Sequence, residues 1–370
     1  MKENPSWLKK MNRNKSLGID WFLVLPVVIL IAISLVTLIS LNFSFFQSQL
    51  TFFVVGIFAF LFFSQTNYKI LGIYSKPIYV ISLILLLLVL FLGIESRGAI
   101  RWIEILGFRF QFSEILKPFL AVSFASFLIE KKRYNLNSFL NIFVFLFPIA
   151  LLIFLQPDLG DALIYVGVVL AVVIYLGFSI KYFVALFAPL FVVMPLIWSI
   201  LHDYQRQRVL TFLDPGKDPL GTSYNVIQSV IAVGSGMLMG KGLGQGTQSG
   251  LRFLPERHTD FIFATISEQL GFIGAIIILI CFGLILYKIY KIFLNTNDKF
   301  CKTFSVIVFF SFLIQIFVNV GMNMGIIPIV GVTLPFVSYG GSSLLSNFIF
   351  LGLLSSINRD SKENEVLEIR

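Results

Sequence analysis

The residues best suited to chemistry lie in the stretch LPERHTDFIFATISEQLG, positions 254–271. This stretch gathers three acids, one guanidinium and one imidazole, namely Glu256, Asp260, Glu268, Arg257 and His258. Carboxylates and imidazoles transfer protons, and guanidinium groups bind anions. An apolar run follows directly, so we expect a polar site at the mouth of a hydrophobic helix.

A second polar group lies in ESRGAIRWIEILGFRFQFSEILKPF, residues 95–119. Glu114 and Lys117 are three residues apart, which puts them on one face of a predicted helix and within reach of each other. Ionisable side chains at the edge of a membrane helix are costly unless they are paired or hydrated. The two residues form either a structural ion pair or the lining of a hydrated cavity.

Two further patterns place polar side chains at helix ends. In QPDLGDA, residues 156–162, a helix N-cap accounts for one of Asp158 and Asp161, and the second favours a functional site only weakly. A polar stripe recurs every four residues at Ser311, Gln315, Asn319 and Asn323. Lipid would not tolerate this stripe, so it faces other helices or a cavity. We expect interhelical hydrogen bonds from the first two residues and site-lining roles for the two Asn.

Composition sets the class of protein. The chain has 370 residues, 57% of them hydrophobic, with a mean hydropathy of +0.91. Several apolar runs reach the roughly 20 residues that cross a bilayer, which predicts a polytopic membrane protein. The net charge of +9 lies mostly in short loops and termini, as the positive-inside rule predicts, and does not indicate nucleic-acid binding.

We expect an all-α fold with ten spans, because nothing in the sequence shows the alternation of a membrane barrel. The spans are predicted at about 20–40, 50–64, 77–94, 113–130, 139–155, 161–178, 182–201, 261–287, 303–325 and 340–357. They form one membrane domain, 20–357, between a cytoplasmic segment, 1–19, and a cytoplasmic tail, 358–370, predicted to be disordered.

The charge distribution predicts the orientation in a cytoplasmic membrane. Lys and Arg concentrate in both termini and in loops 65–76, 131–138 and 288–302, which puts these segments in the cytoplasm. The opposite side receives loop 95–112 and the large loop 202–260. The large loop contains the glycine-dense GSGMLMGKGLGQG, which allows close approach of backbone to a ligand but lacks phosphate-loop spacing. An ordered surface loop with solvated charges accounts for it about equally well.

The polar clusters therefore meet on one face of the membrane, where a substrate with a charged head and a lipid tail would fit. Five stretches of the chain resemble the SEDS family, which governs bacterial shape, elongation, division and sporulation. They are LPERHTDFIFA, YQRQRVLTFLDP, DPLGTSYNVIQS, GKGLGQGTQS and LPFVSYGGSS. The resemblance covers nearly the whole chain, and Arg257 with YQRQR looks more like the RodA branch than the FtsW branch. It implies ten membrane helices and polymerisation of peptidoglycan strands from lipid II outside the cytoplasmic membrane.

The resemblance also implies roles for individual residues. Asp260 matches the family's essential outer-loop Asp, and QFSEILK matches a conserved block containing Glu114 and Lys117. The chain departs from the family pattern at Phe112, where Pro is usual, and at Asp161, where Thr is common.

A glycosyl transfer from lipid II needs a base for the attacking sugar hydroxyl and cations for the departing diphosphate. We assign the base to Asp260, with His258 as its assistant or as the next candidate. The predicted substrate and diphosphate contacts are Gln111, Ser113, Glu114, Asp158, Asn319, Asn323, Ser338 and the cations Arg101, Lys117, Arg208 and Lys241.

No cofactor is required by the sequence, although Mg²⁺ or Mn²⁺ could bridge Asp260 or Glu114 to the diphosphate. The resemblance implies lipid II and undecaprenyl diphosphate as ligands, and a class B penicillin-binding protein and other elongation-complex proteins as partners. A lipid II flippase and a non-catalytic scaffold are the alternatives. A flippase needs functional groups on both sides of the membrane, whereas here they concentrate outside.

Overall fold

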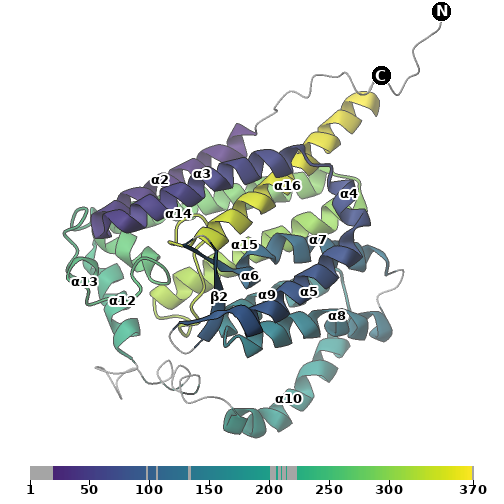
Figure 1. Cartoon of the computed structure of the whole chain (residues 1–370), viewed down its shortest axis with the longest axis horizontal. Helices are drawn as coiled ribbons and strands as arrows, with labels where there is room; N and C mark the ends of the chain where they lie inside the picture. The colour runs from purple at the N-terminus through teal and green to yellow at the C-terminus, as the bar shows by residue number, and fades with distance from the viewer. Residues whose placement is uncertain are drawn as a thin grey trace, which may run out of the picture.

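The structure is a computed structural model that describes residues 20–96, 99–105, 107–131, 135–200, 206, 210, 214 and 223–368. Long helices dominate it, and they lie roughly side by side (Figure 1). The helices are α2 (Trp21–Leu41), α3 (Phe43–Gln65), α4 (Tyr68–Ile73), α5 (Ser75–Leu92), α6 (Phe112–Ile115), α7 (Lys117–Ile129), α8 (Leu136–Leu155), α9 (Leu159–Tyr175), α10 (Ile180–Ile200), α12 (Tyr224–Ser235), α13 (Thr247–Gly250), α14 (Ile262–Asn295), α15 (Lys299–Asn323) and α16 (Gly341–Glu368).

The predicted spans fall on helices, although the span predicted at 113–130 is divided between α6 and α7. Seven of the described helices are long and apolar enough to cross a membrane, and α7, α9 and α10 contribute shorter apolar stretches. Apolar side chains cover these helices and the helical hydrogen bonds satisfy the backbone, which is what a bilayer requires. The chain is therefore a multi-pass membrane protein.

The core lies where α14, α15 and α16 pack together with α2, α3 and α7. Aromatic rings fill much of it, with Phe304, Phe312, Phe336 and Phe350 fully buried. The α3–α16 contact is the most extensive, and it is close because Gly56 of α3 faces the Phe348 ring. The start of α2 and the end of α16 point to one end of the bundle, whereas α12 and α13 lie at the other (Figure 1).

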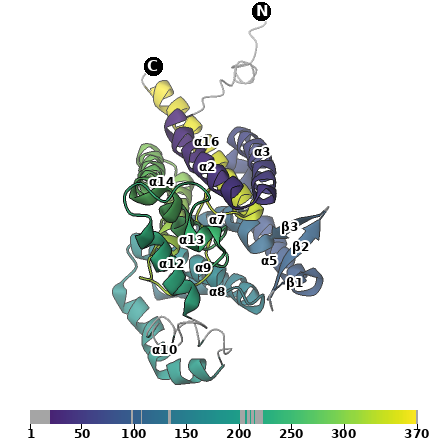
Figure 2. The same ribbon diagram turned by 90° about the vertical axis from the view of Figure 1, so that its left-hand side faces the viewer.

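A small antiparallel sheet corrects the all-α prediction. Strands β1 (Ile94–Ser96), β2 (Ala99–Ile105) and β3 (Phe108–Gln111) form a meander in which Trp102 pairs with Gln111. The sheet projects from the helices beside α5 (Figure 2). The alternation in AIRWIEI and FRFQ is the strand pattern that the reading of 95–112 as a plain loop missed.

The C-terminal tail corrects a second prediction. Residues expected to be disordered continue α16 as a helix to Glu368. The segment predicted as a large outer loop, 202–260, also contains helices, because α12 and α13 lie within it.

Helix α14 is interrupted at Gly271, whose φ of 68° and ψ of −163° lie outside the helical region. The glycine-dense segment 236–242 fills this break. Phe272 and Ile273 donate their N–H groups to the carbonyls of Met237 and Leu238. In return, Lys241 and Gly242 donate to the carbonyls of Glu268 and Gln269. The close approach that these glycines allow is thus made to the backbone of α14.

Candidate active site

Asp260 lies in the turn that leads into α14, and two asparagines of α15 hydrogen-bond to the backbone of that turn. Asn319 and Asn323 of α15 both donate to the Asp260 main-chain carbonyl, at 3.1 and 2.9 Å. Asn323 also accepts the Ala264 N–H at 2.9 Å, and Asn319 donates to the Val332 carbonyl at 2.7 Å. Both Asn side chains are completely buried, whereas Asp260 is only half-buried. The two Asn, which were expected to line the site, are instead buried and support the Asp260 backbone. The interhelical bond expected of Gln315 is also corrected, because its amide donates to the Ser311 carbonyl of the same helix.

His258 and Ser338 lie in the same arrangement. The His258 ring stacks on Phe45 of α3, with centroids 4.2 Å apart and planes 5° apart. Its carbonyl accepts the N–H of Tyr339 at 2.8 Å. Ser338 donates to the Thr259 carbonyl at 2.7 Å and accepts the Leu334 N–H at 2.8 Å. The two residues that precede Asp260 are thus hydrogen-bonded to the loop before α16.

The substitution Asn323→Leu tests this support. It preserves side-chain volume but leaves the Asp260 carbonyl with one donor fewer and the Ala264 N–H unpaired, at a cost of about 1–3 kcal/mol. Displacement of Asp260 should lower the turnover rate by about 10- to 100-fold. The turnover rate and the thermal unfolding temperature measure the two effects. Gln315→Met on the same helix is the control, because Gln315 bonds only to Ser311; equal rates in both variants would contradict the positioning role.

The second cluster is a buried ion network at the junction of α6 and α7. Lys117 Nζ lies 2.8 Å from Glu114 Oε2 and 2.9 Å from Asp161 Oδ1. Ser113 Oγ donates to the other Asp161 oxygen at 2.6 Å. All of these side chains are buried, and Tyr165 closes the network by donating to the Ser113 carbonyl. The predicted Glu114–Lys117 contact is confirmed, although a helix break at Leu116 separates the two residues.

Asp158 extends this network towards the sheet. Its carboxylate accepts Gln111 Nε2 at 2.7 Å and lies 3.6 Å from Arg101 NH1. It also caps α9 by accepting the Asp161 N–H, so Asp158 is the N-cap that was expected of one of the two aspartates. Burial, reinforced by the Asp161 carboxylate, raises the pKa of Asp158 to about 6, although Arg101 opposes the shift. Asp158 therefore gains a proton more readily than an ordinary aspartate.

The charges of this network do not balance. Three carboxylates face two cations, which leaves one negative charge in excess when all are ionised. A diphosphate would have to compete with these carboxylates for Arg101 and Lys117. Among the described residues, no three His, Cys, Asp or Glu side chains are placed to hold a metal ion.

The two clusters meet at the segment that follows α15. Gly160 packs so closely on the carbonyls of Val330 and Gly331 that a side chain would not fit. Gly331 in turn lies against Asp260, whose Oδ2 would be 3.4 Å from a Cβ at that position. Ser342 accepts the Gln111 N–H at 2.8 Å and joins the sheet to α16. Asp260 and the ion network therefore lie on either side of the same segment, residues 330–331.

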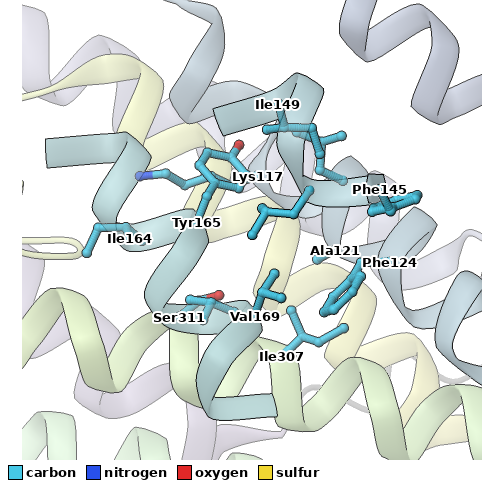
Figure 3. Close-up of a pocket in the computed structure, with 13 residues that line it drawn as sticks. Lys117, Ala121, Phe124, Phe145, Ile149, Ile164, Tyr165, Val169, Ile307 and Ser311 are labelled. Atoms are coloured by element: carbon cyan, nitrogen blue, oxygen red, sulfur yellow. The ribbon is translucent and has the colours of Figure 1, made fainter. Parts of the chain in front are cut away.

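A cavity of about 40 Å³ lies beneath the ion network, among α7, α8, α9 and α15 (Figure 3). Lys117 and Tyr165 lie at one end, and Phe124 and Ile307 at the other (Figure 3). Its remaining walls are almost entirely apolar. The cavity is therefore a small apolar space next to buried charge.

Lys241, a predicted diphosphate contact, is bound to Glu268. Its Nζ lies 3.2 Å from Glu268 Oε1, and it is 30% exposed. The completely buried Glu268 also accepts the N–H groups of Gln248 and Ser249 at 2.9 and 2.8 Å. Glu268 thus organises the loop around α13, which is a structural role.

The substitution Glu268→Gln should loosen this loop. It removes the charge from four hydrogen bonds and places an amide N–H against other donors, at a cost of about 1–3 kcal/mol. Hydrogen exchange of the α13 amides should become faster. Glu104→Gln is the control, because Glu104 is 44% exposed and its described ion pair, with Arg109, is long at 3.8 Å. Unchanged α13 exchange in Glu268→Gln would refute the role of Glu268.

The predicted site residues thus form three groups. Asp260, His258, Ser338 and the two Asn make one, and Arg101, Gln111, Ser113, Glu114, Lys117 and Asp158 make the second. Lys241 belongs to the third, with Glu268. Arg208 lies outside the described residues. Asp161 and Phe45 were not assigned to the site, although an extra acid in QPDLGDA was a usable signal for the first.

Comparisons with known proteins agree with this architecture. Residues 15–363 match the family described as FTSW_RODA_SPOVE, cell cycle protein. Stage V sporulation protein E of Bacillus subtilis is 36% identical over 93% of this chain and 98% of its own. Peptidoglycan glycosyltransferase MrdB of Escherichia coli K12 is 40% identical over 78% of this chain and 79% of its own.

Solved structures show the same fold. A chain from "Structural coordination of polymerization and crosslinking by a peptidoglycan synthase complex" superposes with a TM-score of 0.81 at 32% identity, covering 93% of this chain and 99% of that one. Other relatives are named FtsW. The probable peptidoglycan glycosyltransferase FtsW of Idiomarina loihiensis is 35% identical over 78% of this chain and 71% of its own, so the relatives do not separate the branches. The chain belongs to the FtsW/RodA/SpoVE family, whose curated relatives MrdB and FtsW are named peptidoglycan glycosyltransferases.

Proposed function

We propose that this peptidoglycan glycosyltransferase polymerises glycan strands from lipid II at the outer face of the cytoplasmic membrane and acts in cell elongation. The proposed topology has ten spans and both termini in the cytoplasm. The names of the relatives support the chemistry, and Arg257 with the YQRQR stretch favours the RodA branch.

One observation carries the proposed mechanism: buried donors hold the Asp260 backbone, while the residue as a whole is only partly buried and its carboxylate lies beside Gly331. A sugar hydroxyl of one substrate attacks the anomeric carbon of the other. Asp260 takes the hydroxyl proton as the new C–O bond forms and the lipid diphosphate leaves with the electrons of the old bond. Because the donor is α-linked and the product β-linked, one displacement inverts the centre.

Cations must stabilise the departing diphosphate, undecaprenyl diphosphate in the product. Arg101 and Lys241 are the best placed of the described candidates, because each is about one-third exposed while paired with a carboxylate. Lys117 is 6% exposed and would reach the diphosphate only if the Asp161 pair opened. Arg208 completes the proposed set. A divalent cation bridging the diphosphate to Asp260 or Glu114 stays a proposal, and no step here depends on it.

The proposed partner is a class B penicillin-binding protein. It would cross-link the strands, together with other proteins of the elongation complex. The similar chain in a peptidoglycan synthase complex supports such an assembly.

The test is incubation of the purified chain with lipid II in the presence and absence of the partner. We expect glycan strands from the wild-type protein when the partner is present. Translocation of lipid II across proteoliposomes without polymer would support the flippase instead. A scaffold would give neither product.

A further inference from the structure

The end of α12 carries an exposed apolar tip, Met237–Met239. Its three side chains are 82%, 67% and 78% exposed. Val230 and Ile231 on α12 are each 43% exposed. Between Ser223 and Leu251 the only charged residue is Lys241, and its charge is paired with Glu268. A loop surrounded by water rarely presents so much apolar surface with so little charge.

The height of this tip relative to the bilayer follows from the packing of α2 against α14. At one end of the pair, Asp20 forms an ion pair with Lys288 at 2.5 Å. At the other end, Ser40 donates to Gln269 at 2.9 Å. The helical rise between Asp20 and Ser40 is about 30 Å, the thickness of the hydrocarbon core. The outer edge of the hydrocarbon therefore lies near Gln269 and Gly271.

The tip lies at that edge. Every residue from Ile262 to Gln269 is buried in protein, whereas Phe272 and Ile273 are 58% and 44% exposed. These two residues are the ones whose N–H groups bond to the carbonyls of Met237 and Leu238. The tip is thus continuous with the lipid-facing side of α14.

The backbone around the tip is also suited to lipid. Irregular backbone is tolerated at membrane depth only where its polar groups have partners in the protein. The break at Gly271 would leave N–H and carbonyl groups of α14 without helical partners. The segment 236–242 supplies those partners on both sides of the break, as described above. The Met237 and Leu238 carbonyls therefore have partners in α14, which joins the tip to that helix by backbone hydrogen bonds.

From these observations we infer that Met237–Met239 inserts into the outer leaflet and anchors the outer loop to the lipid beside α14. The occupant of this surface is phospholipid acyl chain. Three features fit acyl chains. The side chains are apolar, the nearby charge of Lys241 is paired, and the packing of α2 against α14 puts the tip at the edge of the hydrocarbon. The insertion is independent of the catalytic proposal, since it concerns where the loop lies and not what it does to substrate.

Fluorescence quenching of the full chain in nanodiscs tests this. A bimane probe is attached to Leu238→Cys, with Phe272→Cys as the lipid-facing reference and Arg252→Cys, exposed in the same loop, as the aqueous reference. The unsubstituted protein gives the labelling background, because Cys281 and Cys301 are buried. We expect the Leu238 probe to be blue-shifted, quenched by phospholipids brominated along their acyl chains, and to lose iodide quenching relative to the Arg252 probe.

Quenching at Leu238 by iodide but not by brominated lipid would overturn the insertion. Protection from both quenchers would put the tip against protein and would overturn it as well. Iodide quenching that disappears only on addition of a penicillin-binding protein would identify a protein-docking surface in place of the lipid contact.

Discussion

Replacing Lys117 by methionine is expected to destabilise the protein by about 3–5 kcal/mol, because it leaves two buried carboxylates without their cation. Glu114 and Asp161 both lie within 3 Å of the Lys117 ammonium and are buried with it. Thermal unfolding in detergent measures the loss, with a thiol-reactive dye that reports exposure of the buried Cys281 and Cys301.

The matched control is Lys69→Met. Lys69 is paired with Asp360 at 3.1 Å but is 56% exposed, so its loss should cost about 0–1 kcal/mol. If Lys117→Met unfolds at the same temperature as Lys69→Met, the buried network does not contribute to stability as described.

The triple variant Glu114→Gln, Lys117→Met, Asp161→Asn separates stability from function. It removes the buried charges together and should recover much of the lost stability, as replacement of whole buried ion pairs often does. A folded triple variant that still makes glycan strands at the wild-type rate would show that Lys117 has a structural role only. A folded and inactive one would show that the reaction needs the charges of this network.

Local spacing was enough to predict several contacts. The short spacing between Glu114 and Lys117, an N-cap at one of Asp158 and Asp161, and the shared face of Asn319 and Asn323 could all be predicted from local helix geometry, even though α6 and α7 break between Glu114 and Lys117. The predicted spans coincide with helices because long apolar runs leave the backbone few alternatives.

Contacts that depend on the path of the chain were not predictable. Lys117 and Asp161 are 44 residues apart, and no periodicity relates them. The target of the two Asn, the Asp260 carbonyl, lies 59 and 63 residues away and is fixed by how the loop returns. From the sequence, the glycine-dense segment could approach either a ligand or protein closely. The structure shows that it pairs with the backbone of α14, at a break in that helix that the sequence did not reveal.

Asp260→Asn should lower the polymerisation rate by about 10²- to 10⁴-fold, the usual contribution of a general base. The amide has nearly the same shape as the carboxylate but cannot accept the hydroxyl proton. The fold should be unaffected, because Asn319 and Asn323 bind the main-chain carbonyl of residue 260, which this substitution keeps. Asp298→Asn is the control, since Asp298 caps α15 and asparagine also caps helices well.

The most direct test of the account is the time course of strand formation from lipid II by purified Asp260→Asn, with the penicillin-binding partner present and wild-type unfolding behaviour verified. The account predicts that wild-type protein and Asp298→Asn lengthen glycan strands while Asp260→Asn forms almost none. Strands made at the wild-type rate by a folded Asp260→Asn protein would contradict it and would remove Asp260 as the base.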